Sequence, residues 1–299
     1  MYEKILVPLD GSDLCELVLP YVEELGERLG SEIILLHVCP PKLGPYSHKH
    51  EVYIEQMAQV VKDQLKGEGR VEAVLLAGEA NKEIIDYAKR EDIGLIAMMT
   101  HGQSGVKRWI LGSTADKVAR ETSKPVLLIR AGVPPAMREE RKLNKLLIPL
   151  DGSKESEVIL PYVEELVLEV TTEPKPEVIL LQVIASTHYV SAEEAVTKVS
   201  YSEAEIEQLK AEAKAYLEKA GSELKSKGIT VKYEEAVGND AEEIINFADK
   251  INADLTAMST HGYSGFSRLF LGSVADRVLH HGNTPLLLVK PTKASEPFS

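Results

Sequence analysis

Cysteine and long apolar runs are both scarce in this chain. The two cysteines, Cys15 and Cys39, are too few for a disulfide framework, and no metal-binding spacing surrounds them. We therefore expect a reducing, cytoplasmic location and no metal site. No run of about 18 apolar residues occurs, which argues against a transmembrane helix. Residues 1–4 lead directly into a strand pattern, so no signal peptide is expected.

Positive charge is also in short supply. The chain has 34 Lys and Arg against 47 Asp and Glu, a net charge of −13. Such a surface repels nucleic acids and anionic membranes, so neither is expected as a partner. At 299 residues, with 44% hydrophobic and 27% charged side chains, the chain is long and apolar enough for two folded domains.

An internal repeat organises the sequence. Residues 19–25 (LPYVEEL) recur unchanged 141 positions later, and residues 8–12 (PLDGS) recur at the same offset. Near the end of each half, residues 100–102 (THG) recur 160 positions later, so the second copy is 19 residues longer. We attribute most of this excess to a lengthened helix around residues 202–227. The predicted organisation is a domain over 1–131, a linker over 132–144, a second domain over 145–291 and a tail over 292–299.

Short apolar runs alternate with helical patterns in each half. In the first half these runs are residues 5–9, 33–38, 71–76, 93–99 and 125–129, with amphipathic stretches at 14–29 and 84–90. Continuous apolar runs are typical of strands buried on both faces of a parallel sheet. The predicted fold class is α/β, with two tandem doubly wound domains that each contain a five-stranded parallel sheet. Ligands of such sheets bind at the carboxyl ends of the strands.

Charge indicates which helix start would receive an anion. The first helix of each half opens with acids, Asp10 and Asp13 in the first copy, which would repel a phosphate. The loop before the last helix, residues 101–113, instead contains glycines, hydroxyls and two cations but no acid, and residues 261–273 keep this character. Glycines let backbone amides approach an anion closely. We therefore expect phosphate at this loop.

Both halves resemble universal stress protein domains. That family's motif is a glycine, two residues, a glycine, nine residues and then Gly-Ser or Gly-Thr. Here the second glycine and the final pair match at Gly102 with residues 112–113 and at Gly262 with residues 272–273. Met99 and Ser259 stand where the motif has its first glycine. The resemblance spans almost the whole chain and implies a fold that binds ATP, AMP or ADP, with or without Mg²⁺.

The resemblance also implies which positions contact the nucleotide. In the first copy these are Pro8, Asp10, Val38 and Met98 for adenine and ribose, and Gly102, Gly112, Ser113 and Thr114 for phosphates. In the second copy they are Pro149, Asp151, Val183 and Met258, followed by Gly262, Gly272, Ser273 and Val274. The intervening loop residues complete the candidate set: Met99, Thr100 and His101 in the first copy, and Ser259, Thr260, His261 and Arg268 in the second.

Several of these residues have a structural alternative. Ser113 and Ser273 start Ser-x-x-Asp patterns and are expected to cap the last helix of each half, with or without a phosphate contact. Asp10 and Asp151 could satisfy a turn instead of a nucleotide. His101 and His261 have no evident carboxylate partner nearby in the sequence, so loop hydrogen bonding is favoured over catalysis. Arg268 either meets phosphate or only solvates the loop. Because Ser259 is smaller than Met99, the second copy is expected to be the better site.

The sequence thus predicts a stress-response protein that binds adenine nucleotide and acts by regulation. No convincing base or arginine finger is present, so catalysis would be at most slow ATP hydrolysis or phosphotransfer. A protein-interaction module with one or both nucleotide sites empty is the other alternative. The final apolar strands, residues 125–129 and 285–289, are expected to pair with each other and to make the chain an intramolecular pseudo-dimer. A further homodimer is left open.

Overall fold

The computed structural model describes residues 1–41, 48–65, 70–100, 111–130, 143–170, 174–192, 195–261 and 271–291. The first half contains β1 (Lys4–Leu9), the 3₁₀ helix η1 (Cys15–Val18), α1 (Leu19–Leu29), β2 (Glu32–Cys39), α2 (His48–Gln64), β3 (Val71–Ala77), α3 (Ala80–Arg90), β4 (Leu95–Met99), α4 (Ser113–Glu121) and β5 (Val126–Ile129). The second half contains β6 (Lys145–Pro149), α5 (Lys154–Glu157), α6 (Ile159–Glu169), β7 (Glu177–Ile184), β8 (Thr187–Ala192), β9 (Ala195–Ser200), α7 (Glu203–Ala220), α8 (Ser222–Ser226), β10 (Val231–Val237), α9 (Asp240–Ile251), β11 (Leu255–Ser259), α10 (Ser273–His281) and β12 (Leu286–Val289).

Each half builds a parallel five-stranded sheet, as the apolar runs predict. The described strands of the first half follow the order β3-β2-β1-β4-β5, and those of the second follow β10-β7-β6-β11-β12. All pairs within a half are parallel. The chain moves outward from β1 to β3 and then crosses to β4, which leaves a switch point between β1 and β4. The predicted fold class is confirmed.

Helices cover both faces of each sheet. Odd-numbered residues of β2 such as Ile33 and Leu35 join one core cluster with Ile54 of α2, while Ile34 and Leu36 join a second cluster with Ile84 of α3. This alternation follows from the two-residue period of a strand. Because helices bury both faces, the strands carry the continuous apolar runs seen in the sequence.

The amphipathic stretch at residues 14–29 is divided into η1 and α1. Pro20 lies in the first turn of α1, where its missing N–H is not needed. Gly30 ends α1 with φ of 67°, a left-handed conformation that glycine adopts without steric cost. The chain can therefore reverse within two residues and enter β2. Among the described residues, no helix combines the length and the apolar character needed to cross a membrane.

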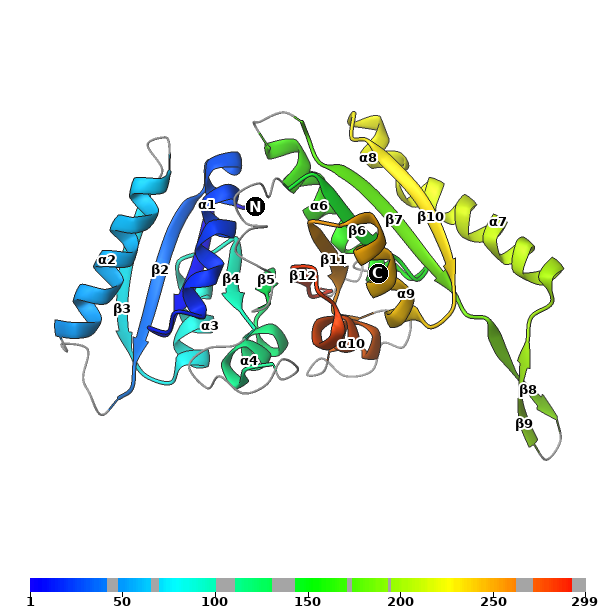
Figure 1. Cartoon of the computed structure of the whole chain (residues 1–299), viewed down its shortest axis with the longest axis horizontal. Helices are drawn as coiled ribbons and strands as arrows, with labels where there is room; N and C mark the ends of the chain where they lie inside the picture. Colours follow the sequence, from blue (N-terminus) through cyan, green and yellow to red (C-terminus); the bar gives the residue numbers. More distant parts are fainter. Residues whose placement is uncertain are drawn as a thin grey trace, which may run out of the picture.

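The two halves share one sheet. β5 pairs with β12 in antiparallel register, with Leu127 opposite Leu287, so the ten paired strands of the described segments form a single sheet. Figure 1 shows these two strands side by side at the middle of the molecule, with one half on either side. The predicted pairing of the two final strands is confirmed.

Cations from each half bind the carbonyl end of a helix in the other half. Arg130 follows β5 and donates to the carbonyl of Gly282, directly after α10. Lys290 follows β12 and donates to the carbonyl of Arg120, in the last turn of α4. Carbonyl groups at the end of a helix have no partner within the helix and carry partial negative charge. The two contacts are of the same kind, because each joins a cation that follows the last strand of one half to the end of the last helix of the other half.

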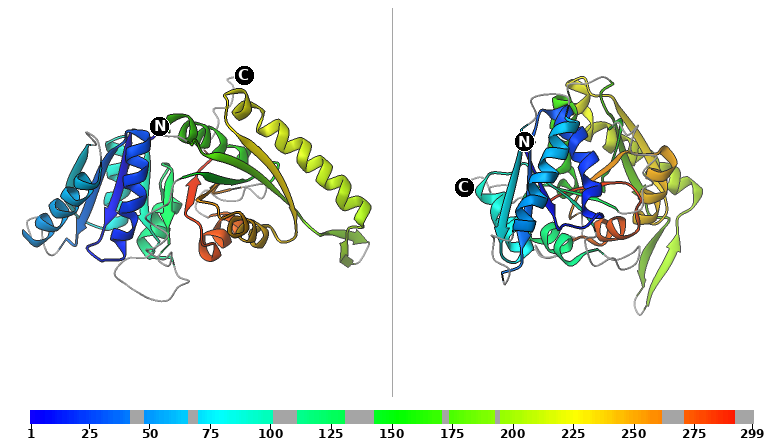
Figure 2. Two further views of the ribbon diagram at one scale, coloured as in Figure 1. Left: turned by 45° about the horizontal axis from the view of Figure 1, so that its top comes forward. Right: turned by 60° about the vertical axis from the view of Figure 1, so that its left-hand side comes forward.

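The extra length of the second half is placed differently from the prediction. α7 has 18 residues and its counterpart α2 has 17, so the helix is hardly lengthened. Instead, β8 and β9 form an antiparallel hairpin before α7, and the short α8 follows it. Figures 1 and 2 show the hairpin extending from the body of the second half. The alanine-rich composition of residues 203–220 indicated the helix correctly, but the insertion lies largely before it.

Candidate functional site

A cavity of about 280 Å³ lies at the carboxyl ends of β1, β2 and β4 in the first half. Apolar side chains from Pro8, Val38 and Met98 form part of its wall, and the start of α4 closes it. The complete lining is Pro8, Leu9, Asp10, Cys15, Leu36, Val38, Ala80, Ile84, Met98, Met99, Thr100, Gly112, Ser113, Thr114 and Ala115. The position matches the switch point at which ligands of doubly wound sheets bind.

The second half contains a corresponding cavity of about 450 Å³. Its lining is Pro149, Leu150, Asp151, Ser156, Leu181, Val183, Ala185, Asp240, Ile244, Met258, Ser259, Thr260, His261, Gly272, Ser273, Val274 and Ala275. The structure therefore brings the predicted residues together in each half. Four of them, His101, Gly102, Gly262 and Arg268, lie outside the described residues.

Asp10 and Asp151 each stabilise a turn at the edge of their cavity. Asp10 Oδ1 accepts hydrogen bonds from the Ser12 backbone N–H at 3.0 Å and from the Ser12 hydroxyl at 2.6 Å. Asp151 Oδ1 accepts the same two bonds from Ser153, at 3.0 and 2.6 Å. The structural role that the sequence left open is thus present in both copies. Both residues also line the cavity, so the turn fixes a carboxylate at its rim.

A glycine precedes the last helix of each half. The N-cap of α4 is Gly112 and that of α10 is Gly272, and neither helix has a side-chain cap. The prediction that Ser113 and Ser273 cap these helices is therefore wrong, because each is the first helical residue. Asp116 does not complete a capping box either, since it binds Arg120 at 2.6 Å. The first residues of both helices line the cavities, and within the described segments no N-cap side chain binds their amides, which is the arrangement of an anion site.

Close backbone packing sets the position of each helix start. The Gly112 N–H donates to the Thr100 carbonyl at 2.7 Å, and the Gly272 N–H donates to the Thr260 carbonyl at the same distance. A Cβ atom at Gly272 would lie 3.0 Å from that Thr260 oxygen. Glycine at this position therefore lets the last helix approach the end of β11 within the cavity wall.

The histidine of the second loop has a local partner. His261 Nδ1 lies 2.9 Å from the Thr260 hydroxyl, which is the loop hydrogen bond that the sequence favoured over a catalytic role. Ser259, which replaces the first motif glycine, is buried and accepts a weak hydrogen bond from the His261 N–H at 3.4 Å. Met99, its counterpart, is buried in a core cluster and also lines the smaller cavity. The larger cavity thus belongs to the copy with the smaller residue.

Two cavity positions were missed by the sequence analysis. Cys15 and Ser156 occupy equivalent places, where the Cys15 thiol donates to the Ser12 carbonyl at 3.0 Å and the Ser156 hydroxyl donates to the Ser153 carbonyl at 2.8 Å. Burial raises the pKa of the Cys15 thiol, which keeps it a donor. The 141-residue offset pairs these two residues, and this could have marked them.

Asp240 was also missed, because it replaces an alanine of the first copy. It is the first residue of α9 and lines the second cavity, where Ala80 stands in the first. Burial, and secondly the negative charge of Asp151, raise the pKa of its carboxyl group. The second cavity therefore contains two acids and the first contains one. This difference sets the electrostatics of the two copies apart.

Comparison with known proteins decides the family. A model of the universal stress protein family matches residues 1–130 and again residues 142–290. The chain belongs to this family. Its two copies of the α/β unit are therefore universal stress protein domains, and the resemblance noted in the sequence is confirmed.

Individual relatives match one half or the whole chain. Universal stress protein MJ0531 of Methanocaldococcus jannaschii is 33% identical over 156 residues, which cover 52% of this chain and 86% of that protein. A universal stress protein of Mycolicibacterium smegmatis is 24% identical over 307 residues, covering 96% of this chain and 97% of its own. The crystal structure of a universal stress protein from Archaeoglobus fulgidus covers 97% of this chain and 99% of its own at 21% identity, with a TM-score of 0.65. The tandem arrangement of this fold is thus shared with a solved structure.

Proposed function

We propose that each half of this universal stress protein binds an adenine nucleotide in the cavity at the carboxyl ends of its strands. The observation that carries the proposal is the pairing of an apolar recess with a helix start that lacks a side-chain cap. Pro8, Val38 and Met98 offer apolar surface to a planar base in the first half. The uncapped amides at the start of α4 offer hydrogen bonds and partial positive charge to phosphates.

The position of the acids supports the same orientation of the ligand. Asp10 follows β1 and lines the cavity, where its carboxylate can accept hydrogen bonds from ribose hydroxyls or an adenine amino group. The first turn of α4 contains one acid, Asp116, and its carboxylate is paired with Arg120 at 2.6 Å, which limits its repulsion of a phosphate. AMP, ADP and ATP are all consistent with a base and ribose near Asp10 and phosphates at the start of α4. Mg²⁺ bound through the phosphates remains part of the prediction.

We propose that the bound nucleotide acts as a signal and that the stress response is regulated by its occupancy. The titratable groups among the described lining residues are Asp10 and Cys15 in the first cavity and Asp151, Asp240 and His261 in the second. These include no lysine or arginine that could neutralise charge developing on a transferred phosphoryl group. Slow ATP hydrolysis and a nucleotide-free interaction module are the competing functions.

A charge at the helix start tests the binding proposal without weakening the fold. Thr114→Asp and Val274→Asp each place a carboxylate in the first turn of α4 or α10, where it favours the helix dipole but repels phosphate. Calorimetric titration with ATP should show that each variant loses one site, while its melting temperature is unchanged or raised. Thr114→Asn and Val274→Asn are the matched neutral controls and should retain binding. Wild-type ATP affinity in both Asp variants would refute the proposed placement.

We extend the proposal to the organisation of the chain. Domains over residues 1–131 and 145–291, a linker over 132–144 and an intramolecular pseudo-dimer about the β5–β12 junction account for the repeat and the shared sheet. A cytoplasmic location suits the two free, buried cysteines, which are stable in a reducing compartment. Further homodimerisation is a prediction that sedimentation of the full chain would test.

A further inference from the structure

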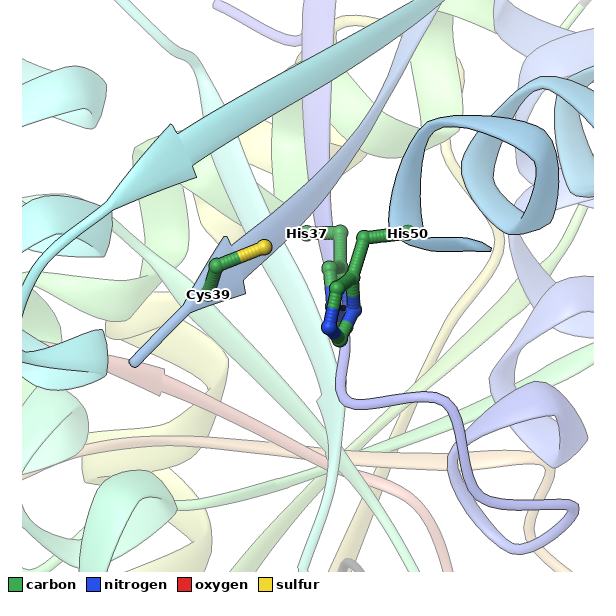
Figure 3. A group of neighbouring side chains, drawn as sticks. All are labelled: His37, Cys39 and His50. Atoms are coloured by element: carbon green, nitrogen blue, oxygen red, sulfur yellow. Dashed lines mark hydrogen bonds between the residues drawn. The ribbon is translucent and has the colours of Figure 1, made fainter. Parts of the chain in front are cut away.

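A cluster of nitrogen and sulfur side chains lies beside the first cavity and takes no part in its wall. His37 and Cys39 are two residues apart near the carboxyl end of β2, and His50 lies in the first turn of α2. One donor atom from each falls within 4.8 Å of the other two. Figure 3 shows the Cys39 side chain pointing toward the paired imidazole rings.

Strand geometry places this cluster behind the cavity wall. Side chains alternate across β2, so His37 and Cys39 share the face that α2 covers, whereas Val38 between them lines the cavity. His37 and Cys39 are both buried, and His50 is half-buried. Of the three side chains, that of His50 on α2 is the one partly exposed to solvent.

Hydrogen bonds orient the His37 ring. His37 Nδ1 lies 2.8 Å from the Leu9 carbonyl oxygen, which can only accept, so Nδ1 carries the proton and Nε2 carries a lone pair. That Nε2 atom lies 2.7 Å from His50 Nδ1. The ring of Tyr53 meets the His37 ring edge-on, with ring centres 5.6 Å apart. A carbonyl that fixes the tautomer and a packed ring that fixes the orientation are the surroundings that metal-binding histidines have.

We propose that His37 Nε2, His50 Nδ1 and Cys39 Sγ bind one Zn²⁺ ion, or a similar borderline-soft divalent transition metal, with water as the fourth ligand. Imidazole nitrogen and thiolate suit such metals, whereas Mg²⁺ and Ca²⁺ select oxygen. Binding moves the His50 proton from Nδ1 to Nε2 and releases the Cys39 thiol proton to solvent, so that both donors offer a lone pair.

The geometry requires only small movements. Tetrahedral Zn²⁺ with bonds of about 2.0–2.1 Å to nitrogen and about 2.3 Å to sulfur places the two nitrogens about 3.3 Å apart and the sulfur about 3.6 Å from each. The ring nitrogens must therefore separate by about 0.6 Å from their present 2.7 Å. The Cys39 sulfur lies within 4.8 Å of one ring nitrogen of each histidine, so an approach on the order of 1 Å gives the required separation. Side-chain rotation at Cys39 and His50 supplies such shifts.

The second half provides an internal comparison. Val38 and Val183 line the two cavities at equivalent positions, which aligns His37 with Gln182 and Cys39 with Ile184. Tyr53 approaches Cys15 and Glu16, and Tyr216 approaches their counterparts Ser156 and Glu157, which aligns His50 with Ala213. The second half therefore has no metal-binding side chain of the same kind at any of these three equivalent positions. The proposal therefore predicts one metal ion per chain.

Metal titration of the full chain tests this site without any nucleotide. After chelation and reduction, Zn²⁺ is titrated in competition with a chromophoric chelator, and Co²⁺ is titrated by absorption spectroscopy. We expect one ion per chain and a thiolate-to-cobalt charge-transfer band. Cys39→Ser, His37→Gln and His50→Ala should each weaken Zn²⁺ binding roughly 100-fold or more. Cys39→Ser should also remove the band, and circular dichroism of each variant checks that it folds.

Two further variants separate the cluster from its neighbours. Cys15→Ser removes the other thiol and introduces the residue of the second half, while His48→Ala removes a nearby exposed imidazole. Both should keep the stoichiometry, the affinity and the cobalt spectrum of the wild type. Absence of a bound ion in the wild type, unchanged binding in Cys39→Ser, or loss of binding in Cys15→Ser or His48→Ala would each overturn the proposal.

Discussion

Leu127 of β5 lies directly opposite Leu287 of β12, and both side chains are buried in the same core cluster. The two halves therefore meet through backbone pairing and through a shared hydrophobic core at once. Loss of the strand pair would expose an apolar edge on each half, which is a site for aggregation.

The first prediction concerns this junction. Leu127→Pro combined with Leu287→Pro removes one backbone N–H from each of the two strands. Each strand therefore loses one hydrogen-bond donor to a neighbouring strand. The free energy of unfolding should fall by a few kcal/mol, and the halves should separate or the chain should aggregate. Small-angle scattering should show a larger radius of gyration than for the wild type.

The control for the junction is Leu127→Ala with Leu287→Ala, which keeps both backbone donors. This variant loses stability through cavity formation but should stay compact in scattering. A proline double variant with an unchanged compact profile would contradict the role of the strand pair.

The second prediction exchanges the residues that distinguish the two cavities. The cavity with Ser259 is about 450 Å³ and the cavity with Met99 about 280 Å³, so the second half should bind ATP more tightly. Met99→Ser should strengthen the weaker site, and Ser259→Met should weaken the stronger one, each by about tenfold, as expected for a change of one to two kcal/mol in local packing. Two-site calorimetry resolves both constants. Equal affinities in the wild type would show that this position does not control binding.

The third prediction is a pH dependence of stability at Glu23, a half-buried residue of α1. Burial raises the pKa of its carboxyl group from 4.5 to about 7. Between these values the folded protein holds a proton that the unfolded chain has lost, so the free energy of unfolding falls as pH rises through this window. Glu23→Gln removes this loss, and after discounting for partial exposure the variant should gain roughly 1 kcal/mol at pH 8 and nothing at pH 4.

Urea unfolding across this pH range measures the effect, and the repeat supplies its control. Glu164 is the counterpart of Glu23 in the second half, but its carboxylate binds Lys227 at 2.7 Å. Glu164→Gln breaks that ion pair and should therefore bring no gain at pH 8. A pH profile of Glu23→Gln that runs parallel to the wild type would show that Glu23 does not titrate in this window.

The fourth prediction concerns an ion pair between the halves. Arg120 binds Asp116 of its own helix at 2.6 Å and Asp276 of α10 at 3.0 Å. A double-mutant cycle with Arg120→Gln and Asp276→Asn should give a coupling free energy of about 0.5–1 kcal/mol that decreases at high salt. The pair of Lys124 with the highly exposed Asp92 should couple more weakly. Zero coupling at low salt would show that Asp276 is not a partner of Arg120 in solution.

Much of the fold follows from the sequence because the relevant signals are local and repeated. Apolar runs located the parallel strands of both halves, and the duplicated segments confirmed one half by the other. The β8–β9 hairpin was missed since it has no counterpart among the described residues of the first copy and lacks a tight-turn motif. The insertion was assigned to a helix around residues 202–227, because the composition of this segment gave a stronger helical signal than the polar residues before it.

The site was predictable where residues lie at the ends of strands. Pro8, Val38 and Met98 end neighbouring strands, so the sheet brings them together. The helix caps were misassigned because a Ser-x-x-Asp pattern does not reveal which residue leaves helical geometry, and here Gly112 does. The cluster of His37, Cys39 and His50 joins a strand to a helix across a connection, so its spacing in the sequence matches no metal motif.

The strand pair at the centre of the sheet also changes how this protein responds to dilution. A homodimer joined through the same strands would dissociate as its concentration falls, whereas a tethered partner strand keeps an effective concentration set by the linker. The sheet of this chain should therefore persist at any cellular abundance. In a homodimer, each substitution appears on both sides of the interface. In this chain the two sides differ, because Arg130 binds the carbonyl after α10 and Lys290 binds a carbonyl at the end of α4. Covalent linkage thus frees each half to evolve separately, one with a sulfur and imidazole cluster and the other with a larger, more acidic cavity.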